Sequence, residues 1–498
     1  MSDTKERKPW YRPRNVFFAV LVAVVLFFGW AFLEVWQVYT AEPSPTIDYR
    51  AKLREMAEQN AGVSPEEADE SWAILIRALD RYKDAENEIN AELAETGFSS
   101  RHEFDRGEVD FGYPLFGPTL PKDVDREQRC LQRIRDLGVM DLITELSTRG
   151  MGIRRPDGIG PMINDLLPSA AAARDFARSQ AVAIRIAVAE GDFQQVVASL
   201  DRTITLVNVI SHQPSLIEHL VSISMMALVV NQLKYALLER GFEIGAYSLL
   251  SETLRKYSPS PFTFALKCER VSYHELADWA FTDEGNGDGF ITSRLDTWTL
   301  NANRQYSFGD AIVARFYCAT KKETKEEIDL LINWLIAEAE AEPTQVGLRD
   351  RFERRIHELS MTGRFPFIRD LFGAPDRAIR IEDALQVEVS ATLVMIAIAQ
   401  YKLRQGKYPA HLDDLVPEIL AEVPIDPLHG GAFGYRLTPD DPHGRPYLLY
   451  STGLDRNDDG GDFDVADSLR CIDDPNAQTD YTVNQPRRPM AEYWDERR

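Results

Sequence analysis

The chain has 498 residues, of which 44% are hydrophobic and 27% charged, and its formal net charge at pH 7 is −23. This composition is typical of a folded protein, long enough for roughly two to four domains with large cores. The excess of acidic residues argues against a nucleic-acid partner, because phosphate binding requires a basic face.

An apolar run near the N-terminus predicts a membrane anchor. Residues 16–33 read VFFAVLVAVVLFFGWAFL, and a helix of this length spans about 27 Å, close to the ~30 Å of bilayer hydrocarbon. Five Lys or Arg residues precede the run, whereas Glu34 and Glu42 follow it. The positive-inside rule therefore predicts a single-pass protein of the bacterial inner (cytoplasmic) membrane, with a cytoplasmic tail at 1–15, an anchor at 16–38 and a periplasmic body. A cleaved signal peptide is the alternative, although no clean small-residue cleavage site follows the run.

Most of the exported chain predicts helices. Residues 39–60 contain two prolines and predict a linker, which leads into a mainly α-helical domain at 61–372. Ser64-Pro65-Glu66-Glu67 is a capping box with proline at the first helical position, and it predicts a helix to about residue 93. Segments rich in glycine, proline and charge predict loops at 98–124 and 150–161. Further helices are predicted at 126–149, 170–189, a segment ending near 210, 216–239, 244–257, 259–281, 308–319, 322–341 and 344–360.

The helical domain has features of stacked helical hairpins. Gly191 and Gly241 stand fifty residues apart, each between two predicted helices. The segment 187–206, AVAEGDFQQVVASLDRTITL, resembles one tetratricopeptide-type helix-turn-helix. The period is too long and the match too short to predict a repeat array, so a hairpin stack and an irregular bundle both fit. Helical-hairpin surfaces suit a protein partner.

The pattern changes in the last quarter of the chain, where an α+β module is predicted at 376–475. An apolar stripe begins at Ile381 and predicts a helix that closes with basic residues and Gly406 as its C-cap. Two short strands, 433–437 and 446–451, flank a turn rich in Pro, Asp and Gly and predict a hairpin. The polar tail, residues 476–498, predicts no regular structure.

The segment from about 381 to 467 resembles the globular part of the major pseudopilin of type II secretion. The matching text is Tyr401, Gly406-Lys407-Tyr408-Pro409, Leu412-Asp413-Asp414-Leu415-Val416-Pro417, Val423-Pro424-Ile425-Asp426-Pro427, Phe433-Gly434-Tyr435-Arg436 and Tyr450-Ser451-Thr452-Gly453-Leu454-Asp455. The resemblance covers under a fifth of the chain and implies a long helix on a small antiparallel sheet, with calcium in the last loop. It also implies a link to secretion or envelope assembly. The family's N-terminal polymerising helix is absent, because several hundred residues separate the anchor from the module.

An acidic loop follows the predicted hairpin, and eight aspartates lie between Asp455 and Asp474. Asp455, Asn457 and Asp459 occupy relative positions 1, 3 and 5 with Gly460 at position 6, which is the first half of a calcium loop. Position 12 is an alanine, so later aspartates would have to complete the ligand shell. The predicted ligands are Asp455, Asn457, Asp459, Gly461, Asp462, Asp464 and Asp467. The alternative is a solvated acidic turn.

A second, weaker calcium loop is predicted upstream. Glu284, Asn286 and Asp288 occupy positions 1, 3 and 5, Gly289 is at position 6, and Ile291 is at position 8. Position 12 is a leucine, so a flexible glycine-rich loop is the alternative.

Signatures of catalysis are weak. The sequence contains no Gly-x-Ser-x-Gly, Walker A or dinucleotide motif. His274-Glu275 begins like a zincin motif, but Asp278 stands where the second histidine belongs. The four cysteines form no Cys-x-x-Cys pair, and their disulfide pairing is left open; they are Cys130, Cys268, Cys318 and Cys471. We therefore expect a structural or interaction protein, with an exported glycosidase-like hydrolase using paired carboxylates in an acidic cleft as the alternative.

Overall fold

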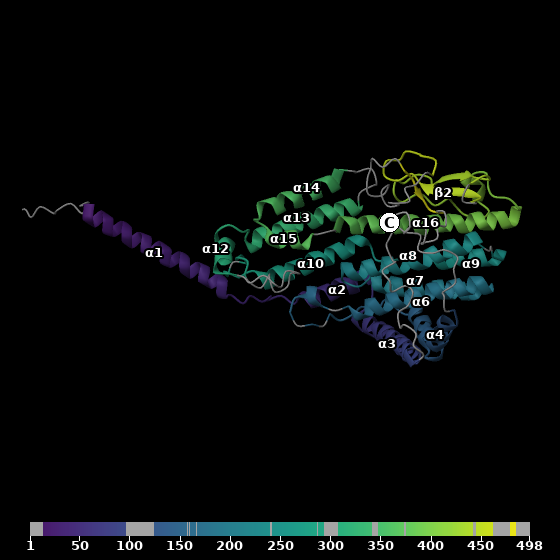
Figure 1. The fold of residues 1–498 in the computed structure, drawn as a ribbon, viewed down its shortest axis with the longest axis horizontal. Coiled ribbons are helices and arrows are strands. Elements are labelled where there is room, and N and C mark those ends of the chain that lie inside the picture. Colours follow the sequence, from purple (N-terminus) through teal and green to yellow (C-terminus); the bar gives the residue numbers. More distant parts are fainter. Residues whose placement is uncertain are drawn as a thin grey trace, which may run out of the picture.

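The computed structural model describes residues 13–95, 124–156, 158, 160–165, 167–239, 242–285, 287–292, 307–340, 347–372, 375–441, 445–461 and 479–484. Over these residues the protein is mainly helical and carries one small three-stranded antiparallel sheet, as the sequence predicts. Helix α1 projects from one end of an elongated body, and the sheet lies over the other half of that body (Figure 1).

The helices are α1 (Pro13–Thr40), α2 (Tyr49–Ala61), α3 (Pro65–Glu95), α4 (Val124–Asp136), α5 (Val139–Ser147), α6 (Pro168–Glu190), α7 (Phe193–Ser211), α8 (Leu216–Glu239), α9 (Ile244–Leu254), α10 (Phe262–Ala280), α12 (Phe308–Phe316), α13 (Lys321–Glu340), α14 (Gly347–Thr362), α15 (Pro366–Leu371) and α16 (Pro375–Gln405), with 3-10 helices at Met162–Asn164 and Leu412–Leu415. The strands are β1 (Gly434–Leu437), β2 (Tyr447–Ser451) and β3 (Tyr481–Thr482).

Within the described residues, two helices are long and apolar enough to cross a membrane, and the extent of their burial distinguishes them. In Phe17–Thr40 of α1, 6% of the most apolar window is buried, whereas in Leu216–Leu238 of α8 the share is 67%. Helix α8 lies inside the body, where α6, α7 and α16 pack against it. Helix α8 is therefore a core helix, and α1 is the candidate membrane span.

The body is built in layers around one large core. Helices α3, α4 and α5 pack on α6 and α7, which contact α8, and α16 covers α8 and α9 (Figure 1). Strand β2 packs on the other side of α16. The same core cluster contains Leu75 of α3, Val394 of α16 and Leu449 of β2. The helix and sheet of the predicted C-terminal module therefore share a continuous core with the helical body.

Local signals in the sequence correctly locate several helix ends. The Ser64 N–H donates to Glu67 Oε2 at 3.0 Å, and the Glu67 N–H donates to Ser64 Oγ at 3.3 Å, so the capping box forms at the start of α3. Gly191 and Gly406 follow α6 and α16 with φ of 78° and 72°, in the left-handed region that favours glycine.

The structure departs from the predictions where long-range packing matters. The predicted linker at 39–60 contains most of α2, whose Leu53 and Ala57 are buried. The predicted helix at 126–149 is divided into α4 and α5 by Gly138, with φ of 68°. In the tail predicted to lack regular structure, β3 pairs antiparallel with β2.

Strand β3 is held on the body by side chains from two helices. The Tyr481 hydroxyl donates to Glu388 Oε1 at 2.7 Å. Lys234 of α8 forms an ion pair with Glu388 of α16 and donates to the Val483 carbonyl at 3.3 Å. The position of β3 is therefore fixed by α8 and α16 as well as by its pairing with β2.

Candidate metal centre

The acidic loop leaves the end of β2 in a tight path. Asp455 Oδ1 accepts a hydrogen bond from the Asn457 N–H at 3.0 Å, and Asp458 Oδ1 accepts one from the Gly460 N–H at 2.9 Å. Arg456 has φ of 61°, and the two glycines that end the described loop have φ of 75° and 78°. These aspartate turns and left-handed residues fold the loop back toward the sheet.

Asp480 extends this loop, although the sequence analysis did not select it. It immediately precedes β3, and the pairing of Tyr481 with Ser451 brings it beside the end of β2. Asp480 is 1% exposed, and its Oδ2 accepts from the Gly461 N–H at 2.7 Å. Its Oδ1 is buried and has no hydrogen-bond partner among the described residues. A buried carboxylate oxygen with no donor is costly, so this atom marks a position where a proton or a cation is needed.

The carboxylates around Asp480 also favour a bound proton or cation at this position. Burial, together with the carboxylates of Asp459, Asp458 and Asp455, raises the pKa of Asp480 to about 7, and the Gly461 N–H only partly offsets them. A divalent cation among these carboxylates would replace the proton and remove the repulsion between them.

Neighbouring groups fix the loop against the sheet. The Tyr450 hydroxyl donates to Asp458 Oδ1 at 2.8 Å, and burial followed by this hydrogen bond raises the pKa of Tyr450. The Thr482 hydroxyl donates to the Gly461 carbonyl at 3.0 Å. A Cβ on Gly461 would lie 2.9 Å from the Tyr450 ring, so the loop approaches the sheet too closely for a side chain there. Both backbone groups of Gly461 are thus used to join the loop to β3.

The predicted ligands divide into two groups. Asp455, Asn457, Asp459 and Gly461 lie in the described loop, whereas Asp462, Asp464 and Asp467 lie outside the described residues. No group of three or more His, Cys, Asp or Glu side chains positioned to hold a metal occurs within the described part of the chain. Calcium at this loop therefore stays a prediction, to which the structure adds Asp480 as a further candidate ligand.

The second predicted calcium loop follows α10 and lies between Phe281 and Ile291, which form an isolated antiparallel bridge. Asp288 Oδ1 accepts from the Gly289 N–H at 2.8 Å and from the Lys322 N–H at 3.0 Å, so this carboxylate caps the start of α13. A Cβ on Gly289 would lie 1.9 Å from the Thr282 carbonyl oxygen, which explains the glycine. Glu284 lies in the described part of the loop, and Asn286 lies outside it. The second site also stays a prediction.

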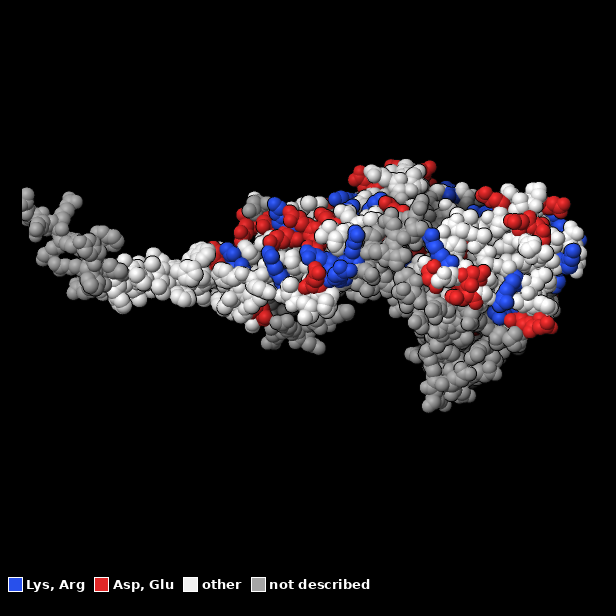
Figure 2. Space-filling model, turned by 90° about the horizontal axis from the view of Figure 1, so that it is seen from above, with Lys and Arg blue, Asp and Glu red and all other residues white. Residues whose placement is uncertain are grey.

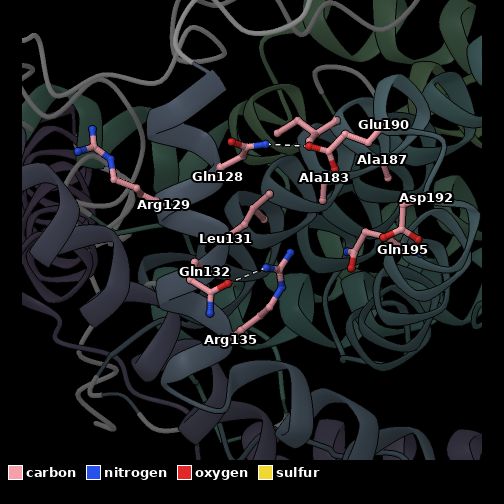
Figure 3. Close-up of a pocket in the computed structure, with 11 residues that line it drawn as sticks. Gln128, Arg129, Leu131, Gln132, Arg135, Ala183, Ala187, Glu190, Asp192 and Gln195 are labelled. Carbon is pink, nitrogen blue, oxygen red and sulfur yellow. Dashed lines mark hydrogen bonds between the residues drawn. The ribbon is translucent and has the colours of Figure 1, made fainter.

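A cleft of about 690 Å³ lies between α4, α6 and the start of α7 (Figure 3). Its two carboxylates already have partners: Glu190 Oε1 accepts from Gln128 at 2.9 Å, and Asp192 caps α7 by accepting from the Gln195 N–H at 3.1 Å. Both carboxylates of this cleft therefore already accept hydrogen bonds, and glycoside hydrolysis by paired carboxylates stays a prediction.

A second cavity, of about 650 Å³, lies at the foot of α1. Asp278 lines it, accepting from the Tyr49 hydroxyl at 2.6 Å and from Lys325 at 2.6 Å. Asp283 and Glu284 of the second acidic loop line it too, and Asp283 Oδ2 lies 3.6 Å from Lys321 Nζ. Lysine side chains thus neutralise Asp278 and Asp283, two of the acidic groups that face this cavity.

The cysteines and His274, the remaining catalytic candidates, lie in environments that suit a structural role. Cys130 and Cys268 are buried thiols, and burial raises the pKa of Cys268, so its reactive thiolate is disfavoured. Cys318 is also a thiol, and Cys471 lies outside the described residues. His274 Nε2 lies 3.1 Å from Asp329 Oδ1, as a surface pair on neighbouring helices.

The buried ion pair between Arg154 and Glu218 links two segments of the helical body. Glu218 of α8 is fully buried, and Arg154 Nε donates to its two carboxylate oxygens at 3.0 and 3.1 Å. Burial raises the pKa of Glu218 to about 7, against the opposing effect of the guanidinium. The pair joins the segment before α6 to the core helix.

Comparison with known proteins gives no relative: no family model, no curated protein and no solved structure matches the chain.

Proposed function

We propose that the protein is a membrane-anchored, exported structural or interaction protein whose C-terminal acidic loop is ordered by calcium. The observation that carries the calcium assignment is the buried, unpartnered Oδ1 of Asp480 beside the carboxylates of Asp455, Asp458 and Asp459. Calcium prefers several oxygen ligands from carboxylates and carbonyls, and this loop supplies both types.

The membrane assignment is supported by the apolar, uncovered α1. The described side chains of the projecting part of α1, residues 17–33, include no charged group, whereas Lys and Arg lie among Asp and Glu on the body (Figure 2). The basic residues before the apolar run support a cytoplasmic N-terminus and a body on the periplasmic side of the inner membrane. The acidic loop follows β2, which lies over the half of the body away from α1 (Figure 1), so this arrangement places the loop away from the bilayer.

A role in envelope assembly or secretion is supported by the resemblance of the C-terminal region to the major pseudopilin. A long helix packed on a small antiparallel sheet, followed by an acidic loop, is what that resemblance implies, and α16, β1 and β2 have this order. Because α16 is also part of the core of the body, we propose an interaction role and not filament assembly. Consecutive helices α6 and α7, which pack side by side, support a helical-hairpin surface for a protein partner.

The test is calcium binding by the full chain in detergent micelles. Calcium that binds the folded state with a Kd of about 10⁻⁴ to 10⁻³ M stabilises it by about 1.4 to 2.7 kcal/mol at roughly 10 mM. Terbium is a suitable second probe, because Tyr450 donates to Asp458 and lies close enough to sensitise a bound lanthanide. We expect terbium luminescence excited through tyrosine, and its loss when calcium is added.

The matched variants remove equal charge at different places. Asp455→Asn with Asp459→Asn should abolish both the calcium stabilisation and the terbium signal. The control pair, Asp413→Asn with Asp440→Asn, changes exposed aspartates outside the loop and should leave both readouts intact. A calcium response that survives in the first pair, or that disappears in the control, refutes the assignment.

A further inference from the structure

Helix α12 presents an apolar face to its surroundings. Four large side chains on one side of its C-terminal half and C-cap are exposed: Ile312 (44%), Val313 (49%), Phe316 (51%) and the C-cap Tyr317 (55%). The opposite side is closed against the body, where Ala311 and Ala314 are buried. A contiguous apolar face of this kind on a short helix indicates a surface that another apolar phase covers.

The same helix is fixed to α1. The Phe308 ring lies 5.6 Å from Phe32 and 5.8 Å from Tyr39, measured between ring centroids. Arg315 Nη2 lies 3.0 Å from Glu34 Oε2. Two α1 valines are buried in the cluster that contains Ala311 and Ala314. Helices α1 and α12 therefore form one packed unit.

This packing sets the depth of α12 relative to a bilayer crossed by α1. The apolar run ends at Leu33, and the six residues from there to Tyr39 extend about 9 Å along the helix. The headgroup region on each side of a bilayer is roughly 5 to 8 Å thick. Trp30 and Trp36 are both 48% exposed near this boundary, as in an interfacial aromatic belt. Helix α12 lies beside this part of α1, at the end of the body from which α1 projects (Figure 1).

We propose that α12 is an interfacial helix whose outer face, formed by Ile312, Val313, Phe316 and Tyr317, inserts into the headgroup region of the bilayer that α1 crosses. The inference rests on the proposed membrane span. The bilayer is favoured over a second copy of the chain or a protein partner because the packing on α1 places this face at the membrane surface without any further association.

The charges of α12 fit this location. Asp310 completes a capping box with Ser307, accepting from its N–H at 2.8 Å, and Arg315 is paired with Glu34. The helix therefore carries no unpaired charge into the interface. A second attachment beside α1 would hold the long body at a fixed angle to the membrane, with the acidic loop at a fixed distance from it.

The test uses the full chain in nanodiscs made either of ordinary phosphatidylcholine or of phosphatidylcholine brominated near the top of its acyl chains, which quenches nearby tryptophan. Phe316→Trp adds a tryptophan to the proposed interfacial face. Leu403→Trp is the control, because Leu403 is 50% exposed at the end of α16 far from α1. We expect brominated lipid to quench the emission added at 316 and to leave the emission added at 403.

The other outcomes are separable. If the emission that Phe316→Trp adds to that of the unmodified chain is the same in both lipids, the interfacial helix is overturned. A blue shift at 316 that appears only with two chains per disc also overturns it, because a second copy would then cover the face. Quenching of Trp30 and Trp36 in the unmodified chain reports on the anchor itself. Quenching at those two tryptophans without quenching at 316 refutes the inference while α1 remains the anchor. If Phe316→Trp disturbs folding, Ile312→Trp repeats the test from the same face.

Discussion

Replacing Asp480 by asparagine tests the candidate metal centre most directly. Asparagine keeps the shape of the side chain and an oxygen to accept the Gly461 N–H, but it removes the charge. The pKa of Asp480 rises from its ordinary value of 3.8 to about 7 through burial and the carboxylates of the loop. This difference corresponds to at most about 4 kcal/mol, and solvent screening of the exposed loop carboxylates reduces it to roughly 2 kcal/mol.

The sign follows from proton binding. Because the folded-state pKa of Asp480 is raised, the folded state binds more protons than the unfolded state between pH 4 and 7. The metal-free protein therefore loses stability as pH rises through this window, and the full cost of the ionised carboxylate is present at about pH 8. In chelator at that pH, the loop and sheet of Asp480→Asn should be more stable than those of the unmodified chain. Addition of calcium should stabilise the variant less than it stabilises the unmodified chain.

Hydrogen exchange of the amides in β2 and β3 measures this local stability without requiring two-state unfolding of the whole chain. A change of roughly 2 kcal/mol corresponds to about a thirtyfold slower exchange in the variant in chelator. Calcium should slow exchange in the unmodified chain much more than in Asp480→Asn. Exchange in chelator that is as fast in the variant as in the unmodified chain would refute the electrostatic reasoning. A full calcium effect in the variant would remove Asp480 from the ligand set.

Three further outcomes are expected. Calcium affinity should fall as pH drops below about 7, by up to tenfold per pH unit, because Asp480 must lose its proton to bind the ion; calorimetric titration across this range checks it, and a flat profile contradicts it. Arg154→Ala should destabilise the body by about 3 to 5 kcal/mol, because it leaves the buried Glu218 unpaired; denaturant midpoints measure the loss, and the exposed Arg149→Ala should cost less than about 1 kcal/mol. Gly434→Ala should loosen the sheet, since a Cβ there would lie 2.1 Å from the Tyr450 ring; faster amide exchange in β1 and β2 is the expected signal, and unchanged exchange would contradict it.

Local signals in the sequence were enough to predict several helices and the residues at which they begin or end. The apolar run predicts α1, the Ser64 capping box marks the start of α3, and Gly191 and Gly406 mark the ends of α6 and α16. Each of these signals acts within a few residues, through side-chain polarity, cap hydrogen bonds or the backbone freedom of glycine. Helix α2 was missed because two prolines before it outweighed the apolar spacing of Tyr49, Leu53 and Ala57.

Sequence patterns alone predict an apolar N-terminal helix, a helical body and an acidic loop with oxygen-bearing side chains at alternate positions. Two features depend on long-range packing: α16 lies between the body and the sheet, and Asp480, nineteen residues beyond Gly461, contacts the acidic loop. Strand β3 is two residues long and has little pattern of its own. Its position depends on pairing with β2 and on contacts to Glu388 and Lys234. Such contacts join residues far apart in the chain, and neither periodicity nor capping carries information about them.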